Sequence, residues 1–506
     1  MRSLCSVQLD MSLTIDTSIE KGYDGVCAQP EPVSRIRKLL ERGARLPRIM
    51  LSALHVLQPV YLKRAAKTTK LRRTAYLDGI RGFAALLVYW LHHELWSHES
   101  QQADSKLESS WGYDGQHYFA AFPGIRTFFT GGHYAVATFF VLSGYVLSTK
   151  PLALINAGEH SHLGDTLASG LFRRWLRLYL PIVCTTFFLL ASWHVFGILA
   201  DFVPESSYRA ELWKWYLELK NFTYIFRLGG DPRFFYHTHT WSIPIEMRGS
   251  VVIYTVLLAF SRLTRKARLC CEGALMVYFL YVADGAHYAM FMAGMCICDL
   301  DYLFEEETFP SWPAGCERAK APFFHVLLMI SIYLGGVPSL NSNLDNLRDS
   351  PGWHYLSWLK PQAVLDYKWF YLFYAAAILV FVVPRIAWLK RFFESRFCQY
   401  LGRISYMFYL LHGPVLWTLG DRLYAAVGWS KESHALTLPG WSGLIPIPAF
   451  GPLGMELNFF APHLILLPVT LWMAEVATTL VDDTSIAFCA WLYNQVIVPP
   501  REKAVL

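Results

Sequence analysis

Long apolar runs separated by short polar segments dominate the chain from about residue 77 onward. A helix needs about 20 mostly apolar residues to cross the hydrocarbon core of a bilayer, and several runs approach that length. The pattern predicts an all-α, polytopic membrane protein with about ten transmembrane helices. They are expected near residues 77–97, 131–149, 178–199, 242–260, 269–283, 285–299, 322–338, 368–385, 402–419 and 459–481.

Two of these runs, 269–283 and 285–299, are shorter than a full span. They form either two separate helices or one tilted helix. A merged helix would reverse the membrane orientation of every element that follows, so the two alternatives predict different topologies.

Three parts are expected along the chain. Residues 1–73 form a cytosolic N-terminal tail without a signal peptide, and its segment from Val33 to Arg45 is basic and amphipathic, which suits an anionic membrane surface. Residues 74–490 form the transmembrane domain, and residues 491–506 form a short cytosolic tail.

Composition and charge support this class. The chain is 54% hydrophobic and 17% charged, whereas soluble domains are about one quarter charged. The net charge of +6 comes from basic clusters in alternate loops, so it indicates topology and not nucleic-acid binding. Basic residues near the first span place the N-terminus in the cytosol, and with about ten spans the C-terminus is expected there too. The protein is expected in an endomembrane or in the plasma membrane. The ten scattered cysteines predict reduced packing residues.

The apolar stretch from Tyr76 to Trp96 contains an arginine near its start and two adjacent histidines near its end. Arg81 and His92 are eleven residues apart, so a helix places them on nearly the same face, about 16 Å apart along its axis. An imidazole at mid-depth is costly in a membrane, so His92 either has a function or hydrogen-bonds to a neighbouring helix. The adjacent His93 leaves open which of the two acts.

Two further basic positions, Arg174 and Arg177, are three residues apart and share a helix face. They either anchor lipid headgroups or hold the phosphates of a cytosolic nucleotide-like donor, because guanidinium groups match phosphate oxygens.

Two polar positions inside apolar runs carry alternative interpretations. Ser143 and Gly144 favour a notch where another helix packs closely. Glu246 is a carboxylate within an apolar run, where a function is the default hypothesis. Its alternative is an intramembrane ion pair with Arg248 or another arginine.

The remaining histidines give weaker signals. His237 and His239 have the spacing of a metal-binding pair, but no third ligand at a suitable spacing is evident, so no metal site is expected. His412 precedes Pro414, where the helix is expected to kink, and a structural role facing its partners is expected for it.

Together, these motifs resemble the acyltransferase 3 family of integral membrane acyltransferases, in family order from about residue 74 to 490. The sequence around Glu246 is similar to the branch found in filamentous fungi. The matching segments are Tyr76-Leu-Asp-Gly-Ile-Arg-Gly-Phe-Ala-Ala with Arg81 and His92, Phe139-Phe-Val-Leu-Ser-Gly, the arginines before Pro181, Trp241 to Glu246, and Leu401-Gly-Arg-Ile-Ser-Tyr to His412.

The resemblance implies a membrane-bound O-acyltransferase that moves an acyl group, usually acetyl, from cytosolic acyl-CoA to a hydroxyl of a sugar, lipid or secondary metabolite. Acyl-CoA is then a co-substrate, with no bound cofactor or metal, and the partners are acyl-CoA, the acceptor and the bilayer. The implied donor-binding residues are Arg81, Arg174, Arg177 and Ser143, and the implied catalytic residues are His92 and Glu246.

Each residue has an implied role. The arginines hold the phosphates of acyl-CoA, and His92 acts as general base or as acyl carrier. The hydroxyl of Ser143 stabilises the oxyanion, and Glu246 orients the acceptor or a cationic partner.

Two alternatives remain. A transporter could use the same residues as a proton or anion pathway without transferase chemistry, although the two halves of the sequence show no internal symmetry. The other large class of membrane acyltransferases also uses an intramembrane histidine, but the spacing of Arg81 and His92 in the first span favours the acyltransferase 3 resemblance.

Overall fold

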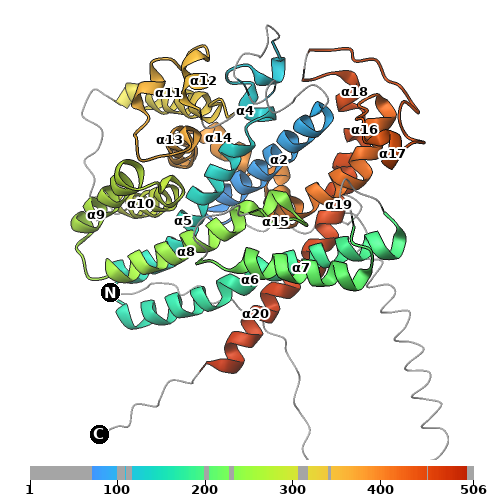
Figure 1. Cartoon of the computed structure of the whole chain (residues 1–506). Helices are drawn as coiled ribbons and strands as arrows, with labels where there is room; N and C mark the ends of the chain where they lie inside the picture. Colours follow the sequence, from blue (N-terminus) through green and yellow to red (C-terminus); the bar gives the residue numbers. More distant parts are fainter. Residues whose placement is uncertain are drawn as a thin grey trace, which may run out of the picture. The chain divides into compact units, whose positions relative to one another are not determined.

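The structure is a computed structural model that describes residues 71–99, 107, 109, 117–198, 204–226, 233–305, 317–339, 343–452 and 454–497. These residues form helices and no β-strand, apart from one isolated bridge between Phe234 and His237. The fold class is therefore all-α, as expected (Figure 1). The amphipathic segment from Val33 to Arg45 lies outside the described residues.

Each of the ten expected ranges coincides with a helix or with consecutive helices. They are α2 (Ala75–Ser97), α5 (Gly132–Asn156), α6 (His160–Phe196), α8 (Ser242–Ala259), α9 (Arg265–Val277) with η5 (Tyr278–Val282), α10 (Ala286–Glu305), α11 (Glu317–Gly335), α13 (Tyr367–Val382) with η7 (Val383–Arg385), α15 (Arg396–Val415) with η8 (Leu416–Gly420), and α19 (His463–Ala477) with η9 (Thr478–Asp482) and α20 (Asp483–Val496).

Shorter helices connect these elements. They are η3 (Phe119–Ala121), α4 (Arg126–Phe129), α7 (Tyr208–Thr223), η4 (Thr238–Trp241), α12 (Leu344–Asp349), η6 (Leu356–Leu359), α14 (Ala387–Phe393), α16 (Asp421–Val427), α17 (His434–Thr437) and α18 (Leu457–Phe460).

Within the described part of the chain, 5 helices are long and apolar enough to cross a membrane. They span Gly132–Asn156, His160–Phe196, Thr238–Ala259, Tyr367–Arg385 and Leu457–Val496. This agrees with a membrane protein, while the total of ten spans and the cytosolic position of both termini stay predictions.

The structure settles some element boundaries. A break after Val282 separates η5 from α10, which begins at Ala286, so the two short runs form separate helices. Helix α6 begins at His160, and the arginine pair therefore lies inside a continuous helix. Helix α20 continues to Val496, through the expected domain boundary at residue 490.

Helix α2 packs against α5 and α15, and glycines allow the closest of these contacts. A Cβ atom on Gly82 would lie 2.2 Å from the backbone nitrogen of Gly402, and one on Gly402 would lie 2.3 Å from the Asp78 carbonyl oxygen. Only glycine fits at such a backbone-to-backbone approach. Ten residues further along both helices, His92 contacts His412, so α2 and α15 run parallel.

A second close contact joins α5 to α10. A Cβ on Gly144 would lie 2.0 Å from the Phe291 carbonyl oxygen, and one on Gly294 would lie 2.0 Å from the Val141 carbonyl oxygen. The packing notch predicted at Ser143 and Gly144 is therefore confirmed for Gly144.

Replacing Gly402 with alanine is expected to destabilise the protein by about 1–3 kcal/mol, because the added methyl group forces α15 away from α2. Thermal unfolding in detergent measures the effect. Gly273→Ala in α9 is the matched control, since a Cβ there meets nothing within 4 Å. Equal melting temperatures for the two variants would contradict the close approach.

Candidate active site

A cavity of about 240 Å³ lies among α2, α5, α6, α8, α15 and η9. All four expected donor-binding residues line it, together with Glu246, whereas His92 is not among its lining residues. The polar part of the lining consists of Asp78, Arg81, Ser143, Arg174, Arg177, Ser242, Glu246, Arg403, Ser405, Tyr406, Tyr409 and Asp482.

The cavity carries more positive than negative charge. Four arginines and three carboxylates line it, which leaves one net positive charge. Arg81 donates a hydrogen bond of 2.8 Å to the Gly402 carbonyl and lies 3.4 Å from the carboxylate of Asp78. Arg403 lies 3.8 Å from the carboxylate of Asp483, which is half-exposed. Such partly exposed pairs are weak, so these cations remain available to an anion.

Arg177 differs from the other arginines of the cavity. Among the described residues, no hydrogen bond or ion pair holds its guanidinium, although Asp482 lies within electrostatic range. An arginine that lines a cavity without a bound partner is suited to an anionic ligand, because its five N–H donors are unused.

The carboxylate of Glu246 is held inside the bundle by two side chains. Arg174 forms an ion pair with Glu246 and also donates to the Ser250 hydroxyl at 2.9 Å. Ser143 donates to Glu246 Oε1 at 2.5 Å. The ion pair that was the alternative interpretation of Glu246 is therefore present. Its partner is Arg174, while Arg248 donates to the Ile225 carbonyl at 2.7 Å.

Three histidines from distant parts of the chain meet close to the cavity, next to its lining residue Tyr409. His92 Nδ1 lies 2.9 Å from His412 Nε2. The ring of His239 stacks on that of His92, with centroids 3.6 Å apart and an angle of 12° between the planes. Sequence spacing could not reveal this cluster, because its members come from α2, η4 and α15.

Tyr409 lies between the cavity and this histidine cluster. Its hydroxyl donates to the His239 carbonyl and lies 2.9 Å from the Ser242 hydroxyl, which also lines the cavity. Its ring centroid is 5.8 Å from that of His412, one turn further along α15. The cavity and the cluster are thus adjacent, with the Tyr409 side chain as the wall between them.

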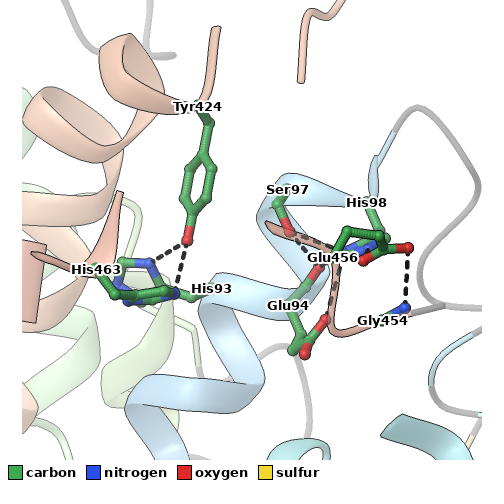
Figure 2. Close-up of polar contacts among 8 residues, drawn as sticks. All are labelled: His93, Glu94, Ser97, His98, Tyr424, Gly454, Glu456 and His463. Atoms are coloured by element: carbon green, nitrogen blue, oxygen red, sulfur yellow. Dashed lines mark hydrogen bonds and ion pairs between the residues drawn. The ribbon is translucent and has the colours of Figure 1, made fainter. Parts of the chain in front are cut away.

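His93 belongs to a different network, on another face of α2. Its Nδ1 lies 2.9 Å from the Tyr424 hydroxyl, which lies 3.2 Å from His463 Nε2 (Figure 2). His463 Nδ1 in turn lies 2.8 Å from the Tyr89 hydroxyl. His93 is fully buried in this network, so the two adjacent histidines face different surroundings.

A second cluster of polar side chains lies at the C-terminal end of α2, on the same side as His93. His98 lies between two carboxylates, 3.4 Å from Glu94 and 3.1 Å from Glu456 (Figure 2). Burial alone would raise the pKa of Glu456, but hydrogen bonds from His98 and the Gly454 amide lower this pKa below its usual range. This group fixes the loop before α18 against the end of α2.

The nearest nitrogens of His92, His239 and His412 lie within 4.8 Å of one another, a distance that also suits metal ligands. A metal ion must lie close to the plane of each imidazole that binds it. Two stacked rings with near-parallel planes cannot both satisfy this condition, so the cluster as arranged does not fit an ion. His237 does not join it, because its Nε2 hydrogen-bonds to the Leu410 carbonyl at 2.7 Å.

The all-helical fold with long apolar helices, and a charged cavity beside histidines inside the bundle, define a membrane protein with a buried polar site. A family model for an acyltransferase domain matches residues 74–473, and the chain belongs to this acyltransferase 3 family. It is therefore an acyltransferase, as its sequence motifs indicated. No solved structure matches the chain.

Several fungal proteins are similar to the chain. O-acetyltransferase PaAT-1 of Phomopsis amygdali is 27% identical over 92% of this chain and 94% of its own length. Acyltransferase clz18 of Cochliobolus lunatus is 23% identical over 71% of this chain and 86% of its own length. Acyltransferase R4 of a Phoma species is 23% identical over 58% of this chain and 69% of its own length.

Proposed function

We propose that the protein is an O-acyltransferase that moves an acyl group, acetyl in the simplest case, from acyl-CoA to a hydroxyl of a sugar, lipid or secondary metabolite. Its similarity to a fungal protein named as an O-acetyltransferase supports the reaction. The observation that carries the donor assignment is the arginine-lined cavity, and above all Arg177, whose guanidinium has no hydrogen bond or ion pair among the described residues.

The arginines contribute unequally to donor binding in this proposal. Arg177 binds a phosphate of acyl-CoA directly, because within the described part of the chain it has no hydrogen bond or ion pair to give up. Arg81 and Arg403 exchange weak contacts with carboxylates for contacts with the donor. Arg174 is already neutralised by Glu246, so this pair shapes the cavity wall and orients its neighbours.

In this proposal the chemistry takes place at the histidine cluster beside the cavity. His92 accepts the proton of the acceptor hydroxyl as this oxygen bonds to the thioester carbonyl carbon. The carbon–sulfur bond then breaks, and the proton passes to the departing thiolate of CoA. Because Tyr409 separates His92 from the cavity, its side chain moves aside when the thioester meets the histidine cluster.

Donor binding can be tested without knowing the acceptor. CoA is expected to raise the melting temperature of the purified protein in a saturable way. Replacing Arg177 with glutamine should raise the half-saturating CoA concentration by about 10- to 100-fold, since a hydrogen bond to a charged group contributes about 1.5–3 kcal/mol. Arg173→Gln is the matched control, because Arg173 is exposed on α6 and is not among the residues lining the cavity.

Two outcomes of the titration would contradict the donor assignment. CoA could fail to stabilise the wild-type protein, which would favour the transport alternative for the same arginines. The two arginine variants could also weaken CoA binding equally, which would indicate general charge attraction in place of a defined phosphate contact.

A further inference from the structure

The hydrogen bonds of His412 fix which of its ring nitrogens carries a proton. His412 Nδ1 lies 2.6 Å from the Tyr409 carbonyl oxygen. A carbonyl oxygen can only accept, so Nδ1 is the donor and carries the hydrogen. The ring is buried in the helix bundle, where the neutral form is favoured. His412 Nε2 therefore presents a lone pair.

This lone pair faces His92. The 2.9 Å contact between His412 Nε2 and His92 Nδ1 requires one hydrogen, and His92 must supply it. His92 then carries its own hydrogen on Nδ1 and keeps the lone pair on Nε2. A chain of two hydrogen bonds thus runs from His92 through His412 to the α15 backbone.

We infer that His412 is a positioning residue that holds His92 in the tautomer with a basic Nε2. The inference rests on the proposed function, in which His92 Nε2 takes the proton of the acceptor hydroxyl. A neutral imidazole here plays the part that a carboxylate plays behind many catalytic histidines, without placing a second charge in the bundle. The same tautomer also suits a His92 that carries the acyl group.

Two further features hold the His92 ring in place. His239 stacks on one face of the ring and is fixed through its own carbonyl, which accepts the Tyr409 hydroxyl hydrogen bond. Gly413 leaves room for this arrangement, because a Cβ there would lie 2.9 Å from His239 Nδ1. Tyr409 therefore supports His412 through its backbone carbonyl, whatever the position of its side chain, and it supports His239 through its hydroxyl until that side chain moves aside.

Substitutions at His412 separate positioning from packing. His412→Gln places an amide oxygen near the position of Nε2, so it can still accept from His92. His412→Leu and His412→Met fill similar space without an acceptor. Ester formation is measured in a strain that lacks the gene and expresses each variant, using the ester that deletion removes. CoA binding to each purified variant is measured by thermal shift, with His354→Leu, an exposed position, as control.

The leucine and methionine variants are expected to lower ester formation by at least 100-fold with unchanged half-saturating CoA concentration. The glutamine variant should restore at least 10-fold over leucine. Equal ester formation by glutamine and leucine variants would overturn the inference. If neither apolar variant folds, the glutamine variant alone tests the positioning role. Ester formation lowered 100-fold or more in this variant, with normal CoA binding, would then contradict that role.

The His92→Ala variant distinguishes a failure of the catalytic role of His92 from a failure of the positioning role of His412. If it still forms the ester, the proposed function of His92 fails, and the role of His412 fails with it. If it forms none while His412→Leu remains fully active, the positioning role alone is wrong. A chelator such as EDTA should leave wild-type ester formation unchanged, and a loss that zinc restores would show that the cluster holds a metal instead.

Discussion

Replacing His92 with alanine is expected to lower acyl transfer by about 10²- to 10⁴-fold, the usual contribution of a positioned general acid–base group. Donor binding should persist, because His92 is not among the residues that line the arginine cavity. The measurements are ester formation in a strain that lacks the native gene and CoA-dependent thermal stabilisation of the purified variant. Loss of both together would indicate a folding defect and would not support a catalytic role.

His93 provides the sharpest comparison for this variant, because it is the adjacent residue in the sequence. Its Nδ1 bonds to the buried Tyr424 hydroxyl, so His93→Ala leaves that hydroxyl with one partner fewer. A loss of about 1–3 kcal/mol in stability is expected, with activity per folded molecule retained. Normal stability combined with absent activity in His93→Ala, and retained activity in His92→Ala, would assign the catalytic role to His93.

The positions of the helices could be predicted because a bilayer leaves few alternatives. Without water to satisfy backbone groups, apolar runs of this length must form helices, and all ten expected ranges do so. The residues at which these helices begin and end are harder to predict. The separation at Val282 depends on a short turn before Ala286 that length alone does not specify. Helix α6 extends back to His160 because its polar first half continues the helix beyond the apolar run.

Residues on one helix were predicted better than contacts between helices. Helical spacing correctly placed Arg81 and His92 on the face of α2 that meets α15, where they contact Gly402 and His412, although only Arg81 lines the cavity. No such rule connects His92 with His412, which are 320 positions apart in the sequence. Gly82 and Gly402 are a signal that could have been used, since two small residues ten positions before the histidines allow α2 and α15 to touch.

Helical spacing already indicates that Arg248 is not the partner of Glu246. Arg248 is two residues away, and positions i and i+2 on a helix do not face each other. Arg248 therefore points elsewhere, to the Ile225 carbonyl. Arg174 on α6 takes its place, and this choice depends on how α6 packs against α8, which no spacing within either helix determines.

Replacing Glu246 with glutamine is expected to destabilise the protein by about 3–5 kcal/mol, because it leaves the largely buried Arg174 without its counter-charge. Ser143 would also lose its charged acceptor. Thermal unfolding in detergent measures this loss. Arg174→Gln should cost a similar amount, since the carboxylate of Glu246 would then be the unpaired charge.

The double variant Arg174→Gln/Glu246→Gln tests whether these losses come from the pair. Removing both charges leaves no unpaired charge in the bundle. The double variant should therefore lose about 1–3 kcal/mol less stability than the sum of the two single losses. The exposed pair Arg348–Asp345, with its atoms 3.0 Å apart, is the control, and its removal should cost less than about 1 kcal/mol. Additive losses at Arg174 and Glu246 would mean that the two side chains do not depend on each other, and that Glu246 is free to act on the acceptor.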